Sequence, residues 1–129
     1  MVDCSHAAYN CCIPQAQQMG CNCFTKSDRN LKRNMVPIPP EEVLERLNQV
    51  DVPMWSYKEE DPSVRHIGPM AQDFHAAFGL GASERRIDVV DANGVSFAAI
   101  QALYRKVQKL EQENQKLRSE LQAVERRVP

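Results

Sequence analysis

The chain has 129 residues and a formal net charge of −1 at pH 7, and its residues are 43% apolar and 26% charged. This is an ordinary soluble composition, which fits one domain with an appendage and excludes an intrinsically disordered chain. The small net charge gives no overall attraction to nucleic acid or to an anionic membrane. No run of apolar residues reaches the roughly 18 that a membrane-spanning helix needs, so we expect no membrane partner.

All five cysteines lie within the first 23 residues, in a segment without a clear hydrophobic period. An odd number confined to one segment argues against a disulfide framework, and the spacings do not fit the paired C-x2-C pattern of zinc sites. We interpret residues 1–24 as a cysteine-rich tail or a remnant of an upstream protein, and we expect neither a metal nor a cofactor. The N-terminus lacks the basic and apolar regions of a signal peptide, which predicts folding in a cytoplasm.

The next segment of the chain, residues 25–98, mixes helix and strand patterns. "TKSDRNLKRNMVPI" (25–38) is typical of a turn followed by a strand. A helix is predicted over 41–50, after Pro39 and Pro40, because apolar residues recur there at helical spacing and acidic residues favour its N-terminus. The alternation around Trp55 in "VPMWSYKEED" (52–61) then predicts a half-buried strand.

Two further elements are predicted before residue 98. "RHIGPMAQDFHAAFGLG" (65–81) indicates the end of a strand, then a short helix that opens at Pro69 and closes at Gly79 or Gly81. "RRIDVVDANGVS" (85–96) predicts a second strand and an Asn-Gly turn. The expected fold class is α+β, a small mixed body in which the Trp55 strand packs on the 69–78 helix. Ile67, Met70 and Phe74 are expected to be buried there.

From about Ser96 onward, apolar residues alternate steps of three and four over about four heptads. This pattern predicts a coiled-coil helix over residues 99–129. About 30 helical residues span roughly 45 Å, which is too long for a body of this size to cover. Neither Asn114, the single polar residue of the heptad pattern, nor its mixture of Val and Leu decides between a dimer and a trimer. The positions are Ile100, Leu103, Val107, Leu110, Asn114, Leu117, Leu121, Val124 and Val128.

Two other interpretations of the heptads are weaker. One is an amphipathic helix that folds back along its own domain. The other is a leucine-zipper protein that binds DNA, which needs a basic stretch directly before the heptads. The residues that stand there, "GVSFAAIQAL" (94–103), carry no positive charge. We therefore expect no nucleic-acid partner.

Three stretches together resemble one family. "SDRNLK" (27–32) followed by "VPI", then "HIGPMAQDF" (66–74), then "VDANGVSFAAIQALYRKVQKLE" (90–111) are similar to the C-terminal intramolecular chaperone auto-processing domain. That domain ends phage tailspikes, endosialidases and related tail fibres. The resemblance runs from about Thr25 to the end of the chain. Two features depart from the family: Asn30 stands where Arg is frequent, and 26 cysteine-rich residues precede the domain instead of a long β-rich fibre.

The resemblance implies a parallel homotrimer that registers an upstream fibre or tailspike as its client and then releases itself. Its implied catalytic pair is Ser27 as the nucleophile and Lys32 as the general base, and its implied scissile bond is Lys26–Ser27. It implies no cofactor. Its setting is the cytoplasm of the host cell during assembly, with the client in the virion tail. The competing interpretation is a structural trimerisation cap that never cuts.

The residues themselves set two conditions for that chemistry. Residues five apart point in different directions on a helix and to opposite faces on a strand. A direct contact between Ser27 and Lys32 therefore needs a turn at residues 28–30, for which Asp and Asn are good residues, or a lysine from a neighbouring chain. A lysine must also be neutral to act as a base, whereas a free one is only about 0.1% neutral near pH 7.4. Burial and nearby cations would favour the neutral form.

Overall fold

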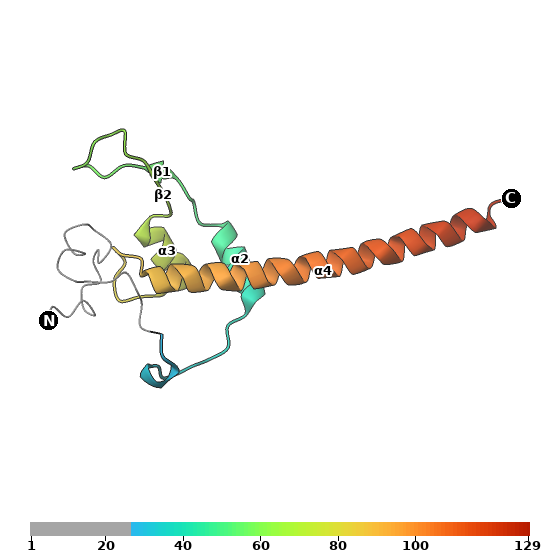
Figure 1. Cartoon of the computed structure of the whole chain (residues 1–129), viewed down its shortest axis with the longest axis horizontal. Helices are drawn as coiled ribbons and strands as arrows, with labels where there is room; N and C mark the ends of the chain where they lie inside the picture. The colour runs from blue at the N-terminus through green and yellow to red at the C-terminus, as the bar shows by residue number, and fades with distance from the viewer. Residues whose placement is uncertain (1–26) are drawn as a thin grey trace. The chain divides into compact units, whose positions relative to one another are not determined.

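The computed structural model describes residues 27–129 (Figure 1). The chain divides into two compact units, of which one ends at Pro37 and the other runs from Ile38 to Pro129. The described part of the first unit contains the 3₁₀ helix η1 (Arg29–Leu31). The second contains the helices α2 (Pro40–Asn48), α3 (Ala71–Phe78) and α4 (Val89–Arg127) and the strands β1 (Met54–Trp55) and β2 (His66–Ile67). The expected α+β fold class is confirmed.

The second unit is built on a stripe of small side chains near the start of α4, which we call the small-residue stripe. Its members recur at steps of three, one and three, so they share one face of the helix. All four side chains are at least 94% buried. They lie near the start of α4, the helix on which α2 packs. Small side chains let two helix backbones approach closely. The stripe consists of Val95, Ala98, Ala99 and Ala102.

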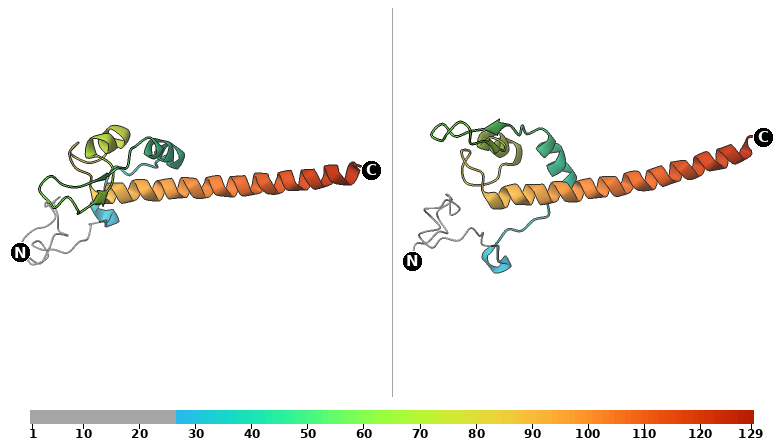
Figure 2. Two further views of the ribbon diagram at one scale, coloured as in Figure 1. Left: turned by 90° about the horizontal axis from the view of Figure 1, so that it is seen from above. Right: turned by 45° about the horizontal axis from the view of Figure 1, so that its top comes forward.

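Beyond the stripe, α4 continues as a helix without cover from the rest of its unit. Every residue from 103 to 129 is exposed, and the views in Figures 1 and 2 agree that α4 extends well past α2 and α3. The heptad positions are among the exposed apolar residues, from Leu103 at 49% to Val128 at 68%. The interpretation in which this helix folds back along its own domain is therefore wrong.

Helix α3 is fixed to α2 by a side chain that reaches its C-terminal end. Arg46 of α2 donates from Nη1 to the carbonyl oxygen of Ala77 at 3.1 Å, where a cation also complements the helix dipole. Helix α3 ends at Gly79, as predicted, with φ at 63° and its N–H donating to the carbonyl of His75 at 2.8 Å. Phe74 is 96% buried and its ring lies 5.0 Å from that of Phe78.

Strands β1 and β2 form a two-stranded antiparallel hairpin in which Trp55 pairs with His66. The predicted Trp55 strand is confirmed, although it is short. The indole Nε1 of Trp55 donates to the carbonyl of Gly68 at 3.1 Å. However, β1 and β2 contact each other and no described helix. The expected packing of this strand on α3 is therefore wrong, and so is the expected burial of Ile67 and Met70, which are 72% and 40% exposed.

The second predicted strand and its Asn-Gly turn do not form, because residues 89–96 are the first turns of α4. Helix α4 starts after Asp88, a residue type that favours helix N-termini, and it runs through Asn93 and Gly94. A glycine inside a helix costs about 1 kcal/mol, which burial of the small-residue stripe offsets. The strand expected within 25–38 is also absent from the described residues of that segment, where only η1 is regular.

Truncation of the buried ring of α3 should destabilise the second unit. Phe74→Ala should lower the free energy of unfolding by about 3–5 kcal/mol, because it removes the ring and leaves a cavity. The matched control is Phe97→Ala, at a ring that is 67% exposed, which should cost under about 1 kcal/mol. Denaturant unfolding at one fixed protein concentration measures both. Equal losses for the two variants would show that Phe74 does not hold the core together.

Candidate functional site

The predicted nucleophile and base lie in hydrogen-bond contact. Lys32 Nζ donates to Ser27 Oγ at 2.7 Å. The contact is possible because residues 28–32 turn back on themselves in η1, which lies between the two side chains. Leu31 N–H donates to the carbonyl of Asp28 at 3.1 Å, and Lys32 N–H donates to that of Arg29 at 3.2 Å. The turn that a direct contact requires is therefore present within one chain.

The geometry allows a proton to move between the two groups without an intervening water. A heavy-atom distance of 2.7 Å lies within the 2.6–3.2 Å range of a nucleophile and its general base. In the direction observed, the amine is the donor; in the reactive direction, the hydroxyl donates to a neutral amine. Both residues are exposed. Lys26, the other side of the predicted scissile bond, lies outside the described residues, as do the five cysteines and His6. The catalytic roles stay predictions.

Two histidines of the second unit lie in other contacts. His66 Nε2 is 2.8 Å from Glu60 Oε1, and its ring lies 4.9 Å from that of Trp55 and 5.2 Å from that of Tyr57. His75 Nδ1 lies 3.2 Å from the carbonyl of Leu80. The hydrogen-bond partners of the two histidines are a carboxylate and a backbone carbonyl, and neither is a hydroxyl or a thiol that a histidine could activate.

The carboxylates with shifted pKa values also lie in the second unit. Glu60 accepts from the backbone N–H of Tyr57 at 2.6 Å, and this bond, together with His66, lowers the pKa of Glu60. The hydroxyl and the N–H of Ser63 lower the pKa of Asp61. Burial and the nearby charge of Asp88 raise the pKa of Asp91. The residues 57–66 are thus a loop fixed by ionised carboxylates, a pattern of structural rather than catalytic hydrogen bonds.

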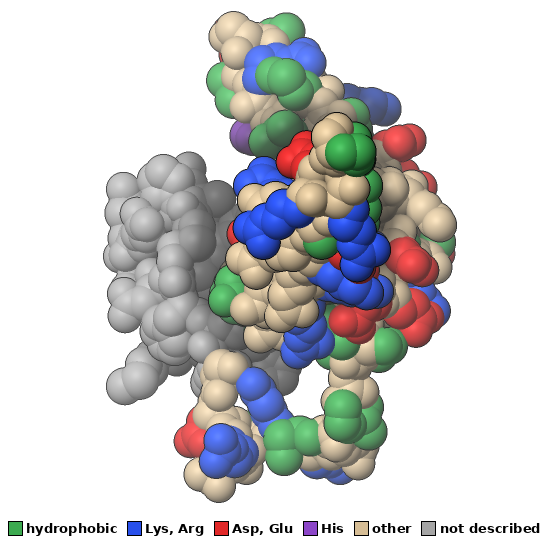
Figure 3. Space-filling model, turned by 90° about the vertical axis from the view of Figure 1, so that its right-hand side faces the viewer, with side chains coloured by type: hydrophobic (Ala, Val, Ile, Leu, Met, Phe, Trp, Pro, Cys, Tyr) green, Lys and Arg blue, Asp and Glu red, His purple; other side chains and the backbone are tan. Residues whose placement is uncertain are grey.

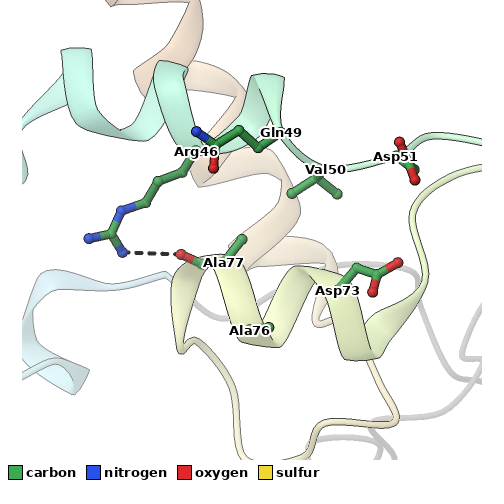
Figure 4. Close-up of a pocket in the computed structure, with 7 residues that line it drawn as sticks. All are labelled: Arg46, Gln49, Val50, Asp51, Asp73, Ala76 and Ala77. Atoms are coloured by element: carbon green, nitrogen blue, oxygen red, sulfur yellow. Dashed lines mark hydrogen bonds between the residues drawn. The ribbon is translucent and has the colours of Figure 1, made fainter.

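The second unit also has two open hollows. One, of about 640 Å³, lies between the end of α2 and α3, and its lining includes Arg46 of α2 and Asp73 of α3 (Figure 4). The other, of about 420 Å³, is mainly apolar and is lined by residues of α2 and α4 together with Phe78 and Leu80. Neither lining contains a Ser, Thr, Cys, Lys or His side chain. The hollows therefore offer no hydroxyl, thiol or amine nucleophile.

Other kinds of site find no support in the part of the chain that the structure describes. Within residues 27–129, no three His, Cys, Asp or Glu side chains are grouped so that they could hold a metal ion. No helix in the same range is long and apolar enough to cross a membrane. On the face seen along α4, Lys and Arg side chains are interspersed with Asp and Glu side chains (Figure 3). That face gives no uniformly basic surface for a nucleic acid.

The hairpin should loosen in acid. Because the pKa of Glu60 lies below its ordinary value of 4.5, its contribution to stability is present above that pH and is lost as the pH falls through the lowered value. Fluorescence of Trp55, the single tryptophan, should change over this range, and Glu60→Gln should reduce that change. Glu59→Gln is the matched control. Identical acid transitions in the wild type and in Glu60→Gln would contradict this assignment.

Comparison with known proteins gives one family. The family model described as chaperone of endosialidase, which carries a peptidase name, matches residues 27–79. No curated protein and no solved structure gives a match. The matched segment starts at Ser27 and includes η1, α2, the hairpin and α3. The resemblance seen in the sequence is therefore confirmed: residues 27–79 of this chain match the chaperone of endosialidase family, which is consistent with the C-terminal intramolecular chaperone domain.

Proposed function

We propose that this chain is an intramolecular chaperone that trimerises, registers an upstream phage-type fibre or tailspike, and then releases itself by cutting Lys26–Ser27. The family match supports the chaperone role and its client. The observation that carries the peptidase role is the 2.7 Å contact between Lys32 Nζ and Ser27 Oγ, at the first residue of the matched segment. The reaction would occur in the cytoplasm of the host cell during assembly.

The proposed reaction uses only groups of the chain and one water. Neutral Lys32 accepts the hydroxyl proton as Ser27 Oγ attacks the carbonyl carbon of Lys26. The tetrahedral intermediate then breaks its C–N bond, and the protonated Lys32 returns the proton to the departing amine of Ser27. The carbonyl carbon of Lys26 is now joined to Ser27 Oγ by an ester bond. Water hydrolyses this ester, which leaves a carboxylate on Lys26 and a free Ser27 at the new N-terminus.

Assembly is the proposed source of the neutral base. A lysine in water is almost wholly protonated near neutral pH, and the side chain of Lys32 is exposed. Burial or the approach of further cations would favour its neutral form. Arg29 and Arg33 flank it in the chain, and a three-fold arrangement would triple their number. Cleavage that waits for this environment would follow registration of the client.

The exposed heptad face of α4 supports a parallel homotrimer. Its apolar side chains are between 49% and 68% exposed, and a matching face on other copies would remove them from water at about 25 cal/mol per Å². This face lies about a third of a turn around α4 from the small-residue stripe, so α2 leaves it free for partners. Asn114 would lie within the seam and favour one register.

The second candidate is a structural trimerisation cap that never cuts. The observation that favours it is the exposure of both Ser27 and Lys32, because a solvated lysine is a poor base. The two candidates make the same use of α4 and differ in the fate of one peptide bond. They are therefore separated by the length of the chain after folding.

Removal of either member of the pair should leave the chain whole. The wild type should yield residues 1–26 and 27–129, whereas Ser27→Ala lacks the nucleophile and Lys32→Ala lacks the base, and each should lower the rate by at least about a hundredfold. Intact-mass measurement after folding gives the pieces and the position of the cut. The rate should also decrease as the pH falls, because a protonated lysine accepts no proton.

Two outcomes would count against this assignment. Wild-type protein that remains whole after days at neutral pH would leave only the structural cap. Cleavage that persists in Lys32→Ala would show that another group is the base. Both variants should still form trimers, and light scattering on the same samples controls for this.

A charge in the seam should prevent assembly. Leu110→Asp would place three like charges in one apolar layer of the proposed coiled coil, so the protein should be monomeric at micromolar concentration by size exclusion with light scattering. Gln112→Asp adds the same single negative charge on the outer side of the helix, and this variant should stay trimeric. If assembly activates the pair, Leu110→Asp should also abolish cleavage. A monomeric wild type, or a trimeric Leu110→Asp, would contradict the seam.

A further inference from the structure

The turn that joins Ser27 to Lys32 depends on one side chain between them. Asp28 stands at the N-terminal cap of η1 with an extended backbone (φ −65°, ψ 131°). Its Oδ1 accepts from the backbone N–H of Asn30 at 2.9 Å. Its own carbonyl accepts from Leu31 N–H at 3.1 Å. Asp28 therefore supplies acceptors to two of the N–H groups of a turn that has only three residues.

A turn this short needs such help. Nucleating a helical turn fixes several dihedral angles for one backbone hydrogen bond, so isolated turns are unstable. The first N–H groups of a helix also have no partner within it. Around η1 the described residues are exposed, so burial adds no stability there. The carboxylate of Asp28 accepts a hydrogen bond from a backbone N–H of this turn.

The contact of the pair follows from the turn. Along a strand, side chains five residues apart would face opposite sides. With η1 formed, Lys32 Nζ reaches Ser27 Oγ at 2.7 Å. Loss of the cap would release residues 28–31 toward extended conformations and separate the two groups. Misplacement of a reacting group by about 1 Å can cost about a hundredfold in rate.

We propose that Asp28 is a positioning residue for self-cleavage: its Oδ1 caps η1 and so holds Lys32 on Ser27, while it neither gives nor takes a proton. This inference rests on the proposed function, since it concerns the same reaction. The role needs an acceptor oxygen and not a charge. A carboxylate close to the lysine would in fact favour the protonated amine, so the cap is useful in spite of its charge.

The test compares three substitutions in the full chain, with cleavage followed as a time course during cell-free synthesis. Asp28→Ala removes the cap and should slow the appearance of 27–129 by between about fivefold, the effect of an ordinary cap, and about a hundredfold. Asp28→Asn keeps an acceptor at the same position and should stay within about twofold of the wild type. Asp51→Ala, in the second unit, removes one acidic residue elsewhere and should leave the rate unchanged.

A second readout reports the turn itself. In an uncleavable Ser27→Ala background, Asp28→Ala should shift the amide NMR signal of Asn30 and speed its hydrogen exchange, whereas Asp28→Asn should restore both toward the values of the parent. The oligomeric state, measured by light scattering, should be the same in all variants. Agreement between the exchange rates and the cleavage rates supports capping as the cause.

Three outcomes would overturn the inference. If the wild type cleaves and Asp28→Ala cleaves equally fast, Asp28 has no positioning role, and the proposed function stays intact. Asp28→Asn as slow as Asp28→Ala would show that the negative charge, and not the cap, is required. A wild type that does not cleave would overturn the proposed function and this inference with it.

Discussion

The packing of α2 on the small-residue stripe of α4 is the contact on which the second unit depends. Four of the five buried core side chains belong to that stripe, and the fifth, Phe74, belongs to α3, which α2 also contacts. Because the stripe occupies one side of α4, the heptad positions on another side stay exposed. One helix thus completes the core of its own chain and leaves an apolar face exposed, and in the proposed trimer this face would contact the other chains.

This arrangement gives a physical reason for coupling folding to assembly. A core of five buried side chains provides little stability by itself, whereas the proposed seam of about four heptads would provide much more once it is shared. Partner chains would therefore stabilise the body as well as the helix. The pair at Ser27 and Lys32 lies in a separate unit of the chain. In the proposed account, the formation of the trimer is the event that both stabilises the body and changes the surroundings of that pair.

Much of the secondary structure could be predicted from local pattern. Hydrophobic period and capping residues predict the helices α2 and α3 and the end of α3 at Gly79. They also predict the heptad helix. The approach of Lys32 to Ser27 also follows from local residues, since Asp28 caps the intervening turn. The predicted strand and turn at the start of α4 are wrong because "DANG" has a strong local turn preference that tertiary packing overrides. Ile67 and Met70 are exposed because the hairpin has no helix over it, and no local pattern reports whether a strand has a partner layer.

Native mass spectrometry during refolding from denaturant tests whether cleavage follows trimer formation, because one spectrum reports the number of chains and the length of each. We expect trimers of the full chain to appear first and to be converted into trimers of residues 27–129, with release of residues 1–26. The rate of that conversion should follow the trimer fraction as the protein is diluted. Trimers that keep all 129 residues of each chain, or cleavage that proceeds equally fast in monomers, would contradict it.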